Sequence, residues 1–273
     1  MAESGWTMVS KMKLGVALGS GGTRGFAHVG VLQVLEEAGF ELHAIAGSSM
    51  GALIASLYAT GAPVHHMEQL ATHLPIARWM DVTFPKMGLV TGVKLHELIK
   101  ILTKRKTFDQ CKIPLAVVAT DLELGERVVL TEGFVHDAVR ASIAIPGIFV
   151  PHRINQRLLI DGGVIDRVPI HATRSLGADF VLAVDVGLFD RLPPVRHVFD
   201  VIVQSIDIME REIFRHRILD ADFVIRPELA LMSSTTFHGI AGAIEAGRDA
   251  ARKAIPELRE KLASVEEAAR GRS

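Results

Sequence analysis

Apolar positions along the chain follow two alternating patterns, which together predict strands followed by helices. Runs of consecutive apolar residues are typical of strands buried on both faces of a parallel sheet. Such runs occupy residues 13–18, 44–46, 113–119, 127–130, 180–186 and 223–225. Helical spacing of apolar residues predicts helices between Gly25 and Gly39 and over 49–59, 133–140, 198–217 and 240–262. The alternation predicts an α/β fold, a three-layer α/β/α sandwich with a mostly parallel central sheet.

Smaller features complete the predicted organisation. Residues 150–154 and 157–160 predict a hairpin, and the last helix is expected to break near Pro256. The segment 65–106 has several short helical patterns, and its apolar side chains fit either a lid or acyl-chain wall, or ordinary core packing. Those side chains are Met67, Leu70, Trp79, Met80, Phe84, Met87 and Leu89. Because the sequence contains no repeat or low-complexity linker, we expect one domain over 13–265, a flexible N-terminus at 1–12 and a frayed tail at 266–273.

Composition narrows the classes of protein. Of the 273 residues 49% are hydrophobic, which is enough for a sizeable core. With 30 basic and 31 acidic residues the net charge is −1, which argues against a nucleic-acid partner. The single cysteine, Cys111, fits a reducing compartment, and no apolar stretch reaches the ~20 residues of a membrane span. We therefore expect a cytoplasmic protein, with transient contact at a membrane surface left open.

The segment 47–51 matches the pattern G-x-S-x-G between a predicted strand and a predicted helix. A serine on such a sharp turn has a crowded backbone, and glycines at positions 47 and 51 would remove the side chains that clash. Ser49 is therefore a candidate nucleophile, at the start of a helix whose amides favour negative charge. The alternative is an ordinary helix start in which Ser48 or Ser49 caps the helix.

A second glycine-rich segment, 19–25, also lies between a predicted strand and a predicted helix. The dinucleotide-binding pattern G-x-G-x-x-G fails here, because Ser20 stands at a required glycine in one register and Arg24 in the other. The stronger interpretation is an oxyanion hole made by the amides of Gly21 and Gly22. Arg24 would then lend positive charge or brace the loop. A tight turn between strand and helix would also use some of these glycines.

A serine hydroxyl needs a general base. His238 has the late position expected of the histidine in an α/β-hydrolase, and His28 lies in the first helical pattern, but a solvated or packed histidine explains both. Asp161 is the better candidate, because an apolar strand delivers its carboxylate to a sheet edge just before Gly162 and Gly163. A plain Asp–Gly turn is the alternative. Partial burial would raise the pKa of Asp161 from ~3.9 toward useful basicity.

Four blocks in the same order along the chain resemble the patatin-like phospholipases, especially small bacterial members related to the catalytic domain of neuropathy target esterase. The blocks are 19–32, 47–51, 140–149 and 161–163, and the stretch 119–122 is also similar. The resemblance covers residues 13–190. It departs from the family pattern at Ser20, where the family often has glycine.

This resemblance implies a Ser–Asp dyad in which Ser49 attacks an ester carbonyl and Asp161 takes its proton. The amides of Gly21 and Gly22 would form the oxyanion hole, with Arg24 near the loop. Gly47 and Gly51 would flank the nucleophile in its elbow, and residues 140–149 would pack a wall of the site.

The family's fold is a three-layer α/β/α sandwich, and the resemblance implies no metal and no organic cofactor. The expected function is that of a serine esterase or lipid acyl hydrolase acting on lysophospholipid, phospholipid or other acyl esters. Two alternatives stay open: an acyltransferase using the same acyl-enzyme, and a non-catalytic lipid-binding regulatory module.

Overall fold

The computed structural model describes residues 12–73, 81, 87–187, 194–195, 198–229 and 239–270. Its centre is an eight-stranded sheet with the strand order β10-β9-β1-β2-β4-β8-β7, and β5 pairs with β4 beside this path. The strands are β1 (Leu14–Leu18), β2 (Leu42–Ser48), β4 (Leu115–Asp121), β5 (Glu126–Leu130), β7 (His152–Ile154), β8 (Arg157–Asp161), β9 (Phe180–Val184) and β10 (Phe223–Ile225). A separate two-stranded sheet joins β3 (Gly88–Val90) and β6 (Gly147–Phe149).

The central sheet is mostly parallel, as the sequence predicts. The neighbours from β10 through β9, β1 and β2 to β4 pair in parallel. The three remaining pairs, β4 with β5, β4 with β8 and β7 with β8, are antiparallel. The antiparallel strand β8 is the one that ends at Asp161.

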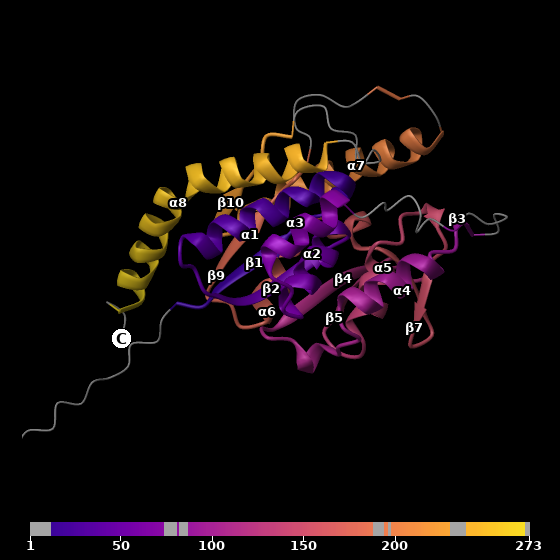
Figure 1. Ribbon diagram of the computed structural model, residues 1–273, viewed down its shortest axis with the longest axis horizontal. Helices are drawn as coiled ribbons and strands as arrows, with labels where there is room; N and C mark the ends of the chain where they lie inside the picture. The colour runs from indigo at the N-terminus through magenta and orange to yellow at the C-terminus, as the bar shows by residue number, and fades with distance from the viewer. Residues whose placement is uncertain are drawn as a thin grey trace, which may run out of the picture.

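Helices cover both faces of this sheet, which makes the fold a three-layer α/β/α sandwich. The helices are α1 (Ala27–Glu37), α2 (Met50–Ala59), α3 (Val64–His73), α4 (Val93–Leu102), α5 (Val135–Ser142), α6 (Ile170–Ser175), α7 (Val198–Arg217) and α8 (Ile240–Arg270). The long helix α8, yellow in Figure 1, lies along α1. Helices α1, α2 and α8 share one core cluster with the sheet, whereas α6 contributes to the clusters on the other face.

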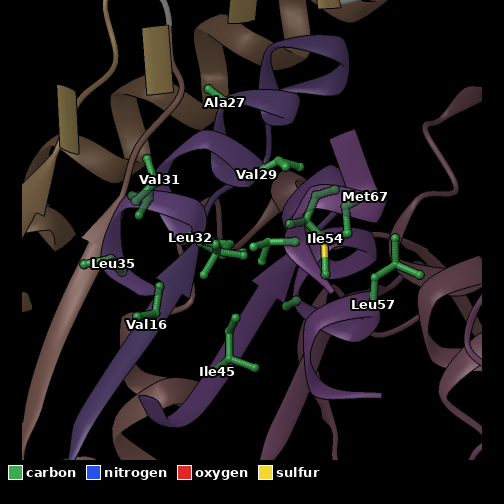
Figure 2. Packing of buried hydrophobic residues seen from close by; sticks show 14 of the residues in the cluster. Val16, Ala27, Val29, Val31, Leu32, Leu35, Ile45, Ile54, Leu57 and Met67 are labelled. Atoms are coloured by element: carbon green, nitrogen blue, oxygen red, sulfur yellow. The ribbon is translucent and has the colours of Figure 1, made fainter. Parts of the chain in front are cut away.

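The alternation of side chains along β1 explains why both faces need a cover. Val16 and Leu18 pack in the main core, while Ala17 packs on the opposite side with Ile170 of α6. Figure 2 shows Val16 on the same side of the sheet as Ile45, facing the side chains of α1 and α2. Each fully buried aliphatic side chain of this kind contributes roughly 1.5–3 kcal/mol. This core fixes the ends of β1 and β2, where the candidate site lies.

Two expectations differ from the structure. Helix α8 continues through Pro256 to Arg270 as one helix that bends part-way along its length (Figure 1), so residues 266–270 of the expected frayed tail are helical. Packing of one side of α8 against α1, with buried residues such as Leu258, stabilises a helix that Pro256 alone would interrupt.

The segment 65–106 contains α4, most of α3 and the strand β3. The helices agree with the short helical patterns of the sequence, whereas β3 was not predicted. Met67 is buried in the core and Met87 is exposed, whereas Trp79, Met80 and Phe84 lie outside the described residues. The lid therefore stays a prediction. Among the described helices none combines the length and apolar character needed to cross a membrane.

Candidate active site

Ser49 lies between the end of β2 and the start of α2, as the strand–turn–helix pattern predicts. Its backbone has φ 53° and ψ −121°, a conformation that is costly for a residue with a side chain. The side chain is nearly buried, with 4% of the residue exposed. Strain of this kind, held in place by the surrounding fold, is typical of a nucleophile elbow.

Close packing explains the two glycines that flank Ser49. A Cβ atom on Gly47 would lie 2.3 Å from the carbonyl oxygen of Gly51. A Cβ atom on Gly51 would lie 2.2 Å from the carbonyl oxygen of Leu18 at the end of β1. Both contacts are with backbone atoms, which cannot rotate away, so any larger residue would displace the turn.

Asp161 lies beside Ser49. The Ser49 hydroxyl donates a hydrogen bond of 2.6 Å to Oδ2 of Asp161, and the amide of Gly163 donates one of 2.8 Å to Oδ1. The hydroxyl of Thr120 holds the backbone of Asp161 by donating to its carbonyl oxygen at 2.9 Å. Both carboxylate oxygens therefore have a fixed orientation. One of them, Oδ2, accepts a hydrogen bond from the serine hydroxyl that a general base would deprotonate.

The sheet register brings together these two residues, which are 112 positions apart. Strand β2 runs parallel to β4 and pairs Ser48 with Val118, whereas β8 runs antiparallel to β4 and pairs Asp161 with Ala119. Strands β2 and β8 therefore approach the middle of β4 from opposite directions and end beside its adjacent residues Val118 and Ala119. An antiparallel β8 is what allows its last residue to reach the nucleophile.

Burial raises the pKa of Asp161 to about 6. The hydrogen bonds from Ser49 and Gly163 act in the opposite direction, and the nearby charge of Asp207 raises the pKa further. A carboxylate with this pKa is ionised at neutral pH and is more basic than an ordinary aspartate. These are the properties that a general base needs.

Ser142, the last residue of α5, also contacts the nucleophile turn. Its hydroxyl accepts a hydrogen bond of 2.9 Å from the amide of Ser49 and donates one of 2.6 Å to the carbonyl oxygen of Val118. It therefore ties the strained turn to β4. The sequence analysis assigned the block around Ser142 to a wall of the site, and nothing near it in the sequence signals a contact with Ser49.

The glycine-rich loop 19–25 follows β1 and packs against the nucleophile turn. A Cβ atom on Gly25 would lie 2.5 Å from the side chain of Met50. Among the hydrogen bonds between residues that the structure describes, none uses the amides of Gly21 or Gly22 as donor. Gly22 has φ 54°, a conformation that favours glycine. The loop thus presents, next to the turn that carries Ser49, two amides that have no acceptor among the described residues.

Arg24 braces this loop. Its Nε donates to the carbonyl oxygen of Gly21 at 3.2 Å, and its Nη2 lies 2.9 Å from both carboxylate oxygens of Asp207 on α7. The arginine is 1% exposed. The sequence left two roles open for Arg24, to lend positive charge or to brace the loop. These contacts are those of a brace, because they hold the Gly21 carbonyl in one orientation.

Ser20, the departure from the family pattern, fits the loop without strain. Its φ lies outside the left-handed region, so glycine is not required there. Its hydroxyl oxygen lies 2.5 Å from the point that a Cβ on Gly163 would occupy. Ser20 and Gly163 are therefore complementary, since the serine fills the space that the glycine leaves.

A buried ionic cluster supports the same loop. Arg167 lies 3.1 Å from Glu210 of α7 and 3.4 Å from Asp185, and its Nη2 donates to the carbonyl oxygen of Ser20 at 3.5 Å. Burial raises the pKa of Glu210 to about 8, and the charges of Asp161 and Asp207 add to this effect. The sequence analysis missed these residues. The only signal was two acidic positions three apart, 207 and 210, on one side of an otherwise apolar helical pattern.

Of the two histidines considered as a base, only His28 lies among the described residues, and it makes no contact with Ser49 there. His28 is fully buried, with Nε2 2.8 Å from the carbonyl oxygen of Gly19. Burial lowers its pKa to about 4, which keeps the imidazole neutral. His28 therefore packs behind the glycine-rich loop. His238 lies outside the described residues.

Comparison with known families agrees with this geometry. The family model described as patatin-like phospholipase matches residues 16–174, which include the glycine-rich loop, the nucleophile turn and Asp161. The chain belongs to the patatin-like phospholipase family. An uncharacterised NTE family protein of Mycobacterium bovis is 38% identical to it over 180 residues, which are 65% of this chain and 50% of the relative.

Another patatin-family relative is a lysophospholipase NTE1 of Phaeosphaeria nodorum, which is 32% identical over 187 residues. That alignment covers 66% of this chain and 12% of the relative. The chain thus spans about half the length of the mycobacterial relative and a small part of the fungal one.

Two solved structures share the fold of this patatin-like chain. VipD from Legionella pneumophila superposes with a TM-score of 0.60 at 17% identity, over 93% of this chain and 67% of VipD. The type III effector protein ExoU superposes with a TM-score of 0.53 at 16% identity, over 92% of this chain and 54% of ExoU.

Proposed function

We propose that this patatin-like protein is a serine hydrolase of lipid acyl esters, with Ser49 as nucleophile and Asp161 as general base. The observation that carries the proposal is the 2.6 Å hydrogen bond from the hydroxyl of Ser49 to Oδ2 of Asp161, at a strained turn. Among the described residues no histidine contacts this pair, and the proposal assigns the role of base to the carboxylate of Asp161. The raised pKa of Asp161 suits it to that task.

In the first step Oγ of Ser49 attacks the carbonyl carbon of the ester and its proton moves to Oδ2 of Asp161. The carbonyl oxygen becomes an oxyanion, for which the amides of Gly21 and Gly22 are the proposed donors. Collapse of this intermediate breaks the ester bond, and Asp161 returns the proton to the leaving alcohol. The product is an acyl ester on Ser49.

In the second step Asp161 takes a proton from water, which attacks the acyl ester. Collapse of the second intermediate releases the fatty acid and returns the proton to Ser49. The Gly163 amide keeps the carboxylate in the same orientation through both steps, because it binds Oδ1 and leaves Oδ2 for the proton.

The substrate class rests on the family and on the relative named as a lysophospholipase. We propose a lysophospholipid, phospholipid or other long-chain acyl ester. Helix α7 supports contact with a lipid surface, because its outward side carries exposed apolar residues while Asp207 and Glu210 on its other side reach the site. The exposed residues are Val198, Val201, Ile208, Met209 and Ile213.

The proposal is tested by hydrolysis of a chromogenic short-chain ester and of a lysophospholipid. We expect both to be cleaved by the wild-type protein and neither by Ser49→Ala. Full activity in Ser49→Ala or Asp161→Asn would rule out the dyad. An acyl product that forms only when an alcohol acceptor is added would indicate transfer, and failure of a fluorophosphonate to label Ser49 in folded protein would indicate a non-catalytic module.

Surface contact is tested separately by sedimentation with vesicles of neutral phospholipid. We expect Val201→Ser with Ile208→Ser to reduce vesicle binding and to leave cleavage of the soluble ester unchanged. Equal binding of wild type and variant would show that α7 does not contact the lipid surface.

A further inference from the structure

Three histidines and one aspartate gather away from the dyad, at the other end of α5. His96 comes from α4, His136 and Asp137 from the first turn of α5, and His152 from β7. The imidazole Nε2 atoms of His96, His152 and His136 lie 2.8, 3.7 and 4.0 Å from Oδ1 of Asp137. The ring of His96 lies 5.2 Å from that of His136 and 5.3 Å from that of His152. Three separate segments thus direct their imidazoles at one carboxylate.

Hydrogen bonds to Asp137 do not satisfy every buried ring nitrogen of this cluster. Nδ1 of His136 is buried without a hydrogen-bond partner, and Nε2 of His96 is buried beside Asp137 without the alignment of a hydrogen bond. Buried ring nitrogens are normally satisfied. The nearby ammonium of Lys100 is paired with Glu97 at 3.0 Å.

The donor set and its spacing suit a metal ion. One ligand atom each from His96, His136 and Asp137 lie within 4.8 Å of one another. Zinc binds imidazole nitrogen and carboxylate oxygen at ~2.0–2.2 Å, usually with four ligands in a tetrahedron. Ligand atoms in such a site are roughly 3.5 Å apart. The ligand atoms here lie within 4.8 Å of one another, so they need to move about an ångström closer together. The side chains of His96 and Asp137 are partly exposed, and the proposal requires them to rotate by this amount.

We propose that His96, His136 and Asp137 bind a divalent transition-metal ion, most suitably Zn²⁺, and that His152 supplies the fourth ligand. The site holds three imidazole nitrogens and one carboxylate, a donor set that favours zinc over calcium or magnesium. It leaves no open position for substrate, so the ion has a structural role and takes no part in ester cleavage.

Arg140 indicates what the ion would stabilise. One turn after His136 on α5, Arg140 donates from Nη2 to the carbonyl oxygens of Thr91, before α4, and of Val150, before β7. The proposed ion ties the same three segments together. Helix α5 ends at Ser142, which holds the amide of Ser49. A metal at one end of α5 would therefore fix the helix that positions the nucleophile turn at its other end.

The test uses the full chain, stripped by a chelator and titrated with Zn²⁺ and with Co²⁺ as a spectroscopic probe. We expect one Zn²⁺ per chain, a rise in Tm on addition of Zn²⁺, and the visible absorption of four-coordinate Co²⁺. His96→Ala with Asp137→Asn should abolish stoichiometric binding, and His152→Ala should weaken affinity by roughly tenfold or more.

His171→Ala is the matched control, because His171 also faces a carboxylate, that of Asp220 at 3.0 Å, but without further ligands. It should bind Zn²⁺ as the wild type does. Absence of stoichiometric Zn²⁺ binding by wild type, or unchanged binding in His96→Ala with Asp137→Asn, would overturn the proposal. Labelling of Ser49 by a fluorophosphonate reports on the dyad separately.

Discussion

Asp161 and Asp121 end two neighbouring antiparallel strands, β8 and β4, yet their surroundings differ. The carboxylate of Asp121 accepts from Arg157 at 2.6 Å and from the amides of Glu123 and Leu124 at 3.0 Å each. These bonds, with that of Arg157 the largest cause, hold the pKa of Asp121 below its usual range. Asp161 is buried with one hydroxyl and one amide as partners, and its pKa is raised to about 6.

The comparison shows which surroundings allow a carboxylate in this sheet to act as a base. An arginine stabilises the ionised form of Asp121, so that group has little tendency to take a proton. Asp161 is buried and has no described cation beside it, so burial leaves its ionised form less stable and more basic. Three of the four predictions below test this difference and one tests the hold on the Ser49 turn, from the largest expected effect to the smallest.

Exchange of each aspartate for asparagine should affect activity very differently. Asp161→Asn should lower kcat by roughly 10³-fold or more, because the variant keeps the shape of the site and loses the proton acceptor. Asp121→Asn should stay within about threefold of wild type. Steady-state hydrolysis of a soluble ester measures both, and similar losses in the two variants would remove the distinction.

Ser142→Ala should lower kcat about 10–100-fold without removing either dyad residue. The change leaves the amide of Ser49 and the carbonyl of Val118 without their partner, so the free energy of unfolding should also fall by about 1–3 kcal/mol. Ser142→Thr, which keeps a hydroxyl, is the control. Unchanged activity in Ser142→Ala would show that the strained turn is held by other contacts.

The same two asparagine variants should change stability in opposite directions. The folded-state pKa of Asp161, about 6, lies above the ordinary value of 3.8, so the native state holds its proton more tightly and loses that advantage as pH rises through 6. Asp161→Asn should therefore be more stable than wild type at pH 8, by about 2–3 kcal/mol. The difference should disappear below pH ~4.

The contribution of Asp121 to the pH dependence of stability has the opposite sign, because its folded-state pKa is depressed. Its contribution to stability is present above its ordinary pKa and is lost as pH falls through the folded-state value, so Asp121→Asn should be less stable than wild type at pH 8. Urea unfolding at several pH values compares the two variants. A loss of stability for both at pH 8 would contradict the proposed environment of Asp161.

The smallest effect is expected for Arg157→Ala. Removal of the guanidinium should raise the pKa of Asp121 and lower Tm at pH 7, with activity within ~2-fold of wild type. The Tm difference between wild type and variant should shrink as pH falls below the ordinary pKa of aspartate. A loss of activity comparable to that of Asp161→Asn would show that Asp121 belongs to the reacting site.

The features of this site that were predictable from sequence are local. Ser49 was identified from glycines two residues away on each side, and the same close packing explains those glycines in the structure. The choice of Asp161 over a histidine rested on an apolar strand followed by glycines and on the family resemblance. The layers of the fold followed from the alternation of apolar runs and helical spacing.

The residues that sequence analysis missed depend on contacts between distant segments. Ser142 reaches the amide of Ser49 across 93 positions, and Arg24 reaches Asp207 across 183. No local pattern specifies such partners, because they follow from how β4, α5 and α7 come together. The unbroken course of α8 through Pro256 has the same origin, since packing along α1 outweighs a local preference.

The pH dependence of Ser49 labelling by a fluorophosphonate tests the central claim, that Asp161 is the base, most directly. The rate should rise about tenfold per pH unit up to a midpoint near 6 and then level off, because only the ionised carboxylate accepts the proton of Ser49. In Asp161→Asn labelling should be slow and independent of pH through this range. An unchanged profile in Asp161→Asn would contradict the account.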